Sequence, residues 1–82
     1  MLFLDLKIGA GITIAGMAGI TVSAIGDDRV TLLTGNAEEI LAIDEERDFG
    51  ELHVILESVT KTTARMGFKT DNIAALVTHH WP

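Results

Sequence analysis

Apolar and polar residues alternate along most of the first half of the chain, a pattern that predicts short β-strands. The clearest strand is Ile20–Ile25, in which Ile20, Val22 and Ala24 share one face. Turns rich in Gly, Asp and Asn separate the strands, and Gly26–Asp28 has the composition of a hairpin turn. The five expected strands are residues 1–7, 12–14, 20–25, 29–33 and 40–43. Such closely spaced strands favour an antiparallel sheet or a small barrel.

The spacing of apolar residues changes after Asp44. Positions three or four apart are then apolar or Thr, namely Phe49, Leu52, Leu56, Val59, Thr63 and Met66. This spacing predicts a long amphipathic helix that begins near Asp48, or at the rival start Asp44, and ends at Gly67. A second short helix is expected from about residue 70 to His80. The predicted fold class is therefore mainly β with C-terminal α.

The expected organisation is one compact unit with two parts, a β domain over residues 1–48 and a helical extension over residues 49–82. No internal repeat is visible in the sequence. A core of this size is marginal, which makes a dimer a reasonable expectation. The chain has no cysteine, in keeping with a cytoplasmic location.

Charge is distributed unevenly along the chain. The net charge is −6, and all of it falls in residues 1–48, because the acids and bases of residues 49–82 balance. An acidic β domain is a poor partner for phosphate backbones, since nucleic-acid affinity usually rests on Lys and Arg.

Residues 8–26 contain no charged side chain and are long enough to span a bilayer. Five glycines and interleaved Thr and Ser dilute their hydrophobicity, and Asp5 spoils the basic start that a signal peptide needs. We expect neither a membrane span nor a secretory signal.

Short motifs follow one another in the first half without obvious gaps. They are Met1–Leu4, Lys7–Gly9, Ile12–Ile14, Ile20–Val22 and, after a turn beginning at Asn36-Ala37, the strand end Ile40–Glu46. Their order resembles the carbon storage regulator family (CsrA/RsmA) of small bacterial RNA-binding proteins, over roughly residues 1–48.

The resemblance implies an intertwined homodimer in which the first and last strands pair across subunits. It also implies post-transcriptional regulation through GGA stem-loops in mRNA leaders. The family's RNA surface combines the first strand of one subunit with the fifth strand of the other. The matching positions in this chain are Leu4, Leu6, Lys7, Ala42, Ile43 and Asp44.

Several of these positions depart from the family pattern. Leu6 and Asp44 stand where the family has Arg, and Ile43 replaces its usual His. Each lost contact is expected to cost about 1–3 kcal/mol of RNA-binding free energy. The alternative is an acidic CsrA-like protein-interaction module that does not bind RNA, either a heterodimerising antagonist or a subunit of a larger assembly.

Other candidate chemistry is weaker. The acids Asp44, Glu45, Glu46 and Asp48 have the composition of a cation site, but solvated acids at a helix start explain them better. His79-His80 and His53 lack a third metal ligand at suitable spacing. No nucleophile has a His and an acid arranged around it, so we expect neither an enzyme nor a cofactor.

The C-terminal part offers two interpretations. The apolar stripe of its expected helix is usually core, and we favour packing within the subunit or across a dimer. The other interpretation is a protein-docking surface made of Phe49, Leu52, Leu56, Val59 and Trp81.

Overall fold

The computed structural model describes residues 1–14, 19–71 and 76–80, and nine strands run through them. The first five are β1 (Leu2–Leu6), β2 (Ala10–Ile14), β3 (Ile20–Ile25), β4 (Arg29–Thr34) and β5 (Ala37–Ala42). The last four are β6 (Glu46–Phe49), β7 (Leu52–Val59), β8 (Ala64–Lys69) and β9 (Leu76–His80). The five strands expected in the first half are therefore present.

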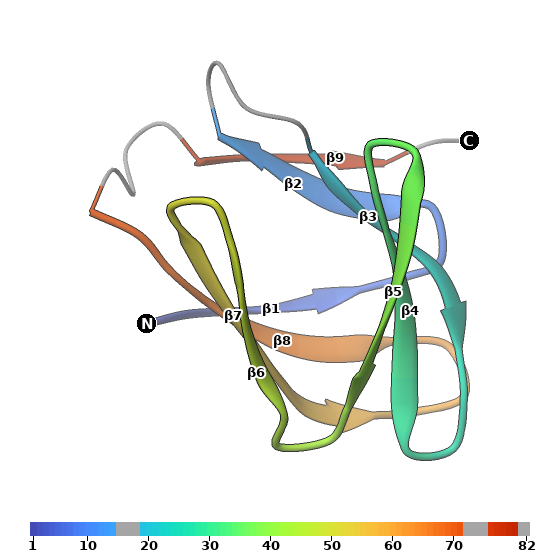
Figure 1. The fold of residues 1–82 in the computed structure, drawn as a ribbon. Helices are drawn as coiled ribbons and strands as arrows, with labels where there is room; N and C mark the ends of the chain where they lie inside the picture. Colours follow the sequence, from blue (N-terminus) through green and yellow to red (C-terminus); the bar gives the residue numbers. More distant parts are fainter. Residues whose placement is uncertain (15–18, 72–75, 81–82) are drawn as a thin grey trace.

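The strands form two antiparallel sheets that face each other (Figure 1). The first sheet has the order β1-β8-β7-β6, and the second has the order β5-β4-β3-β2-β9. Both ends of the chain are built into this arrangement, because β1 pairs with β8 and β9 pairs with β2. The chain passes from one sheet to the other at the β1–β2 corner, at the β5–β6 corner and a third time between β8 and β9.

The core lies between the two sheets and takes one face of each. Alternate residues point inward, as the period of a strand requires. The buried side chains are Leu6, Ile12, Ile20, Val22, Val30, Leu32, Leu41, Leu52, Val54, Leu56, Ala64, Met66 and Phe68.

The long helix expected from the spacing after Asp44 is wrong. Residues 46–69 form the three strands β6, β7 and β8 instead. Leu52, Val54 and Leu56 are buried at strand period, and a β-bulge between Leu56 and Ser58 then shifts the phase by one residue. That shift directs Leu56 and Val59 to the same side, which produced the helix-like spacing of three.

The short C-terminal helix is also wrong in the part that is described. Residues 76–80 form β9, which pairs with β2 from Ala10↔His80 to Ile14↔Leu76. The described chain is therefore all-β, and the boundary at residue 48 lies inside β6 rather than between two structural parts. Gly67, the expected helix stop, lies within β8.

The strands β1–β4 and β5–β8 repeat the same arrangement. Each half contains a hairpin with one bulge at the same place, since Val22↔Leu32 and Ala24↔Thr31 in one half match Leu56↔Met66 and Ser58↔Arg65 in the other. The two tight turns match as well, with backbone hydrogen bonds of 2.8 Å from Gly26 to Arg29 and from Thr60 to Thr63.

The two corners between the sheets follow the same repeat. Gly9 and Asp44 both have positive φ, at 91° and 68°. Their amides donate to the carbonyls of equivalent residues, Gly9 to Val22 at 2.8 Å and Asp44 to Leu56 at 2.7 Å. Aspartate tolerates this left-handed conformation better than most residues do, which explains how an acid stands where the other half has glycine.

The repeat is incomplete at one place. β9 extends the second sheet beyond β2. The equivalent of β2 in the first sheet is β6, and among the described residues no strand lies beyond β6. One sheet consequently has five strands and the other four, with an open edge at β6.

Candidate functional site

The first-strand part of the expected RNA surface is largely inside the protein. Leu6 is only 6% exposed and belongs to the core, and Leu4 packs against that core. Lys7 is exposed in the turn after β1, where its carbonyl accepts the amide of Ala10 at 2.9 Å. Of these three positions, only Lys7 offers an exposed polar group to a ligand.

The fifth-strand part lies at the corner after β5. Ala42, Ile43 and Asp44 are exposed there, and Asp44 uses its amide to bond with Leu56. β1 is an edge of the first sheet and β5 is an edge of the second, so the two strands are not hydrogen-bonded neighbours. Within one chain the structure does not combine them into a continuous strand surface.

The residues considered for docking are mostly internal. Leu52 and Leu56 are buried, and Phe49 and Val59 are half-buried against the core. They come from β6 and β7 rather than from one helix face. Trp81 lies outside the described residues.

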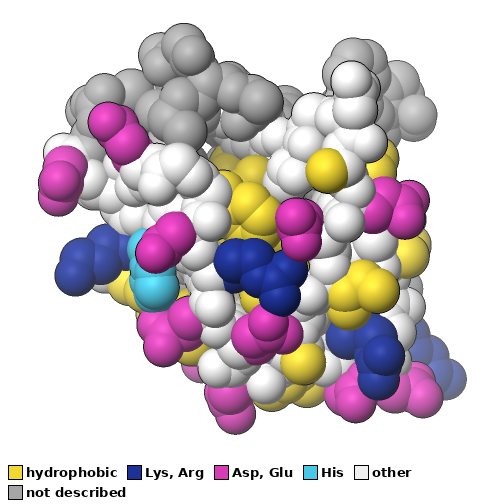
Figure 2. Space-filling view, viewed as in Figure 1, with side chains coloured by type: hydrophobic (Ala, Val, Ile, Leu, Met, Phe, Trp, Pro, Cys, Tyr) yellow, Lys and Arg dark blue, Asp and Glu magenta, His cyan; other side chains and the backbone are white. Residues whose placement is uncertain are grey.

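β6 lies at the edge of the first sheet opposite to β1, and its residues alternate between two faces. Arg47 and Phe49 are partly buried, whereas Glu46 and Asp48 are exposed. Figure 2 shows hydrophobic surface in a hollow between β6 and β5, whose positions can be found in Figure 1. Asp and Glu side chains are spread around that hollow.

Arg47 makes two ion pairs on this side of the molecule. Its Nη1 lies 2.8 Å from Glu39 Oε2 on β5, and its Nη2 contacts Glu45. The backbone amide of Ala42 donates a hydrogen bond to the Glu45 carboxylate, and this bond is the larger cause of a lowered pKa of Glu45. The Arg47 guanidinium lowers that pKa further. These pairs tie β5, the corner and β6 together.

His53 on β7 links the two exposed acids of β6. Its Nδ1 lies 2.6 Å from Asp48 Oδ1 and its Nε2 lies 2.7 Å from Glu46 Oε1. Hydrogen bonds to Glu46 and Asp48 raise the pKa of His53, because both carboxylates favour the imidazolium. The acid block read as a helix start is thus part of a strand edge with its own cationic partner.

Metal binding finds no support in this acid block. Among residues 1–14, 19–71 and 76–80, no group of three or more His, Asp or Glu side chains is placed to hold an ion.

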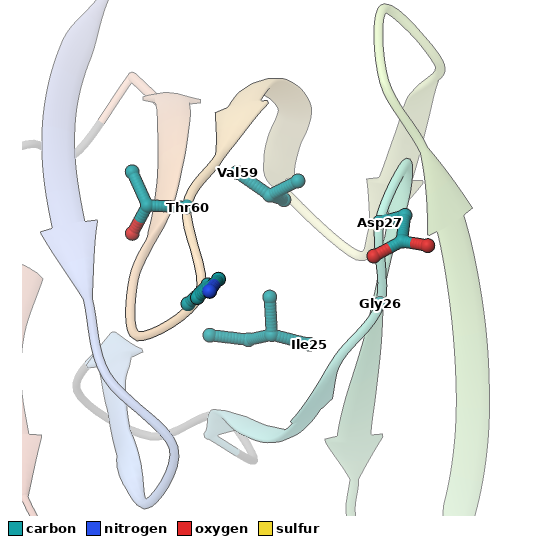
Figure 3. A pocket seen from close by; sticks show the side chains of 6 residues that line it. Ile25, Gly26, Asp27, Val59 and Thr60 are labelled. Carbon is teal, nitrogen blue, oxygen red and sulfur yellow. The ribbon is translucent and has the colours of Figure 1, made fainter.

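A cleft of about 450 Å³ lies between the two equivalent hairpin turns (Figure 3). Its lining comes in matching pairs, Ile25 with Val59, Gly26 with Thr60 and Asp27 with Lys61. Asp27 and Lys61 give the two turns opposite charges. The described lining carries no pairing of nucleophile with base.

The described part of the chain contains no helix long and apolar enough to cross a membrane.

The open edge at β6 and the hydrogen bonds that His53 makes to the acids of that edge were not predicted from the sequence. The alternation of charged and partly apolar positions along Glu46, Arg47, Asp48 and Phe49 was the signal in the sequence for such a strand.

A scan against protein-family models and searches of curated proteins and of solved structures found no match, so these comparisons do not test the resemblance to the carbon storage regulator family.

Proposed function

We propose that this protein is an acidic protein-interaction module that binds an extended segment of its partner along the open edge of β6. One observation carries the proposal: β9 covers the edge of β2, and no described strand covers the equivalent edge of β6. An edge strand presents unpaired backbone donors and acceptors, and adding a strand to such an edge is a common way to bind peptides.

The side chains on β6 argue against a second copy of the chain as the occupant. If two β6 strands paired antiparallel around Arg47, Arg47 would face Arg47 of the second copy, and Glu46 would face Asp48. Like charges directly opposite each other destabilise a strand pair. An inward-pointing charge such as Arg47 is also a known protection of an edge against self-association. The partner is therefore a different protein.

The strand pairing within one chain differs from the pairing expected across a homodimer. The resemblance implied that the first and last strands pair across subunits. In this protein β1 pairs with β8 and β9 pairs with β2. We propose that the module acts as a monomer in the cytoplasm, because one chain supplies both halves of the repeat.

RNA binding is the second candidate function, and one feature favours it. Arg65 stacks over the Phe3 ring at 5.5 Å from the ring centroid, on the outer face of β1 and β8, and stacked aromatic and Arg side chains are a common RNA contact. Arg65 is, however, already paired with Glu57 at 2.9 Å and with Asp5 at 3.5 Å. These acids weaken any attraction to phosphate.

Titrations followed by amide NMR separate the two functions. The first uses a set of extended pentapeptides that differ in charge, and the second uses a GGA stem-loop at low and moderate salt. The proposal expects shifts at residues 46–49 with at least one peptide class and none with RNA. Salt-sensitive RNA binding that shifts β1 and β8 would establish the second candidate instead. The interaction-module proposal fails if no peptide of any charge shifts β6.

A further inference from the structure

The occupied edge of β2 predicts the direction and register of a strand on β6. β9 runs antiparallel to β2, with Leu76 opposite Ile14 and His80 opposite Ala10. The corners equate Gly9 with Asp44, so β2 corresponds to β6 one residue at a time. A five-residue segment bound at the open edge of β6 would therefore run antiparallel to β6. Its first residue would lie opposite Phe49 and its fifth opposite Glu45.

The two faces of β6 favour different side chains on that segment. Its second and fourth residues would lie opposite Asp48 and Glu46, whose side chains are 74% and 56% exposed. Directly opposed residues of opposite charge stabilise an antiparallel pair. Its first residue would lie opposite Phe49, which packs against the core and favours an apolar neighbour.

We infer that the partner segment is a basic alternating strand, with Lys or Arg at the two positions opposite Glu46 and Asp48 and an apolar residue opposite Phe49. This inference rests on the proposed function and adds the chemistry, direction and register of the ligand. His53 already bridges the two acids from the β7 side, and the incoming cations would approach them from the open side. The net charge of −6 adds long-range attraction for such a segment.

The test uses the full chain and synthetic pentapeptides flanked by Gly and Ser. Val-Lys-Thr-Lys-Val has the inferred pattern, Val-Glu-Thr-Glu-Val reverses its charges, and Lys-Val-Thr-Val-Lys keeps the composition but moves the cations to the other face. We expect the first peptide to bind about tenfold more tightly than the other two, as two reversed or misplaced charge pairs imply. Its affinity should decrease with salt.

Protein variants locate the contact. Glu46→Lys with Asp48→Lys should reverse the preference, so that Val-Glu-Thr-Glu-Val binds best. Glu38→Lys with Asp27→Lys makes the same charge change at exposed positions outside β6, and it should leave the order of the peptides unchanged. Circular dichroism of both double variants confirms that they remain folded before any peptide is added.

The outcomes separate the two proposals. Equal binding of all three peptides at β6 would refute the basic partner and leave the interaction module intact. No shift of β6 with any peptide would refute both. Preference for Lys-Val-Thr-Val-Lys would show that the register taken from β9 is wrong.

Discussion

Ile12 and Arg47 occupy equivalent positions in the two halves of the fold, opposite Ile20 and Val54 respectively. Ile12 is 1% exposed, whereas the Arg47 side chain is 33% exposed. Their neighbours follow the same contrast, because Leu4 in one half corresponds to Glu39 in the other. The apolar residues Leu4 and Ile12 stand in the half whose sheet β9 extends. The ion pair of Glu39 and Arg47 stands in the half where no described strand lies beyond β6.

Removing the charges at the open edge should make the protein self-associate. We predict that Arg47→Ile together with Glu39→Leu, which copies the other half, turns β6 into an unprotected apolar edge. Sedimentation velocity over a range of concentrations would detect the resulting oligomers. Arg29→Ile with Glu38→Leu changes the same residue types at exposed sites outside the β6 edge and serves as the control. A strictly monomeric edge variant would contradict the protective role of Arg47.

Stability should decrease as pH rises through the pKa of His53. The imidazolium donates to both Glu46 and Asp48, so folding raises its pKa. A raised pKa gives stability that is complete below the pKa of the unfolded chain and is lost above that of the folded chain. Thermal melts should therefore show a decreasing Tm between about pH 6 and pH 8.

His53→Gln provides the control for this pH effect, because Gln keeps hydrogen-bonding groups and cannot titrate. The difference in Tm between the two proteins should shrink as pH rises over the same range. Asp28 and Glu45, whose pKa values are lowered, remain ionised throughout it and leave the comparison unaffected. A constant difference would mean that protonation of His53 does not stabilise the folded protein.

The β7 strand should be essential for stability, although the spacing of its apolar residues imitates a helix. We predict that Leu56→Ala lowers the free energy of unfolding by about 2–5 kcal/mol, because Leu56 is fully buried. Leu33→Ala, the same change at a side chain that is 37% exposed, should cost below about 1 kcal/mol. Urea denaturation of both variants gives the comparison, and equal costs would refute the assigned core.

Gly67 should resist substitution. An added Cβ would lie 2.5 Å from Met1 Sδ, 2.8 Å from Phe3 Cε1 and 2.9 Å from Ile55 Cγ2, so Gly67→Ala is expected to cost about 1–3 kcal/mol through overpacking. Phe3 lies directly opposite Gly67 in the β1–β8 pair. Adding Phe3→Ala should recover part of that cost, and a double-mutant cycle in urea measures the coupling. Simple additivity would show that the two residues are not in contact.

The sequence was a good guide wherever alternation was uninterrupted. Ile20 and Val22 follow the period of two, and the strand that this period predicts is present as β3. The bulge at Glu57 broke that period in β7, and the resulting spacing of Leu52, Leu56 and Val59 imitated a helix. The β-branched residues around it, such as Val54 and Ile55, were the signal for a strand.

The repeat was hidden because the two halves share burial rather than residue type. Val22 corresponds to Leu56, Val30 to Ala64 and Leu32 to Met66, and all six side chains are buried. None of these three pairs is identical, since a core accepts different apolar residues of suitable volume. The open edge followed from the repeat and could not be inferred without the pairing of the strands.

The pairing of β1 with β8 also constrains how the chain folds. In this pairing Leu2 lies opposite Phe68 and Asp5 lies opposite Arg65. The hydrogen bonds of β1 therefore cannot form until β8, about 60 residues further along the chain, is also in place. Contacts so distant in sequence slow folding, because the entropy of closing the loop is lost before the pairing is gained. We expect closure of the first sheet around β1 to be a late step in folding.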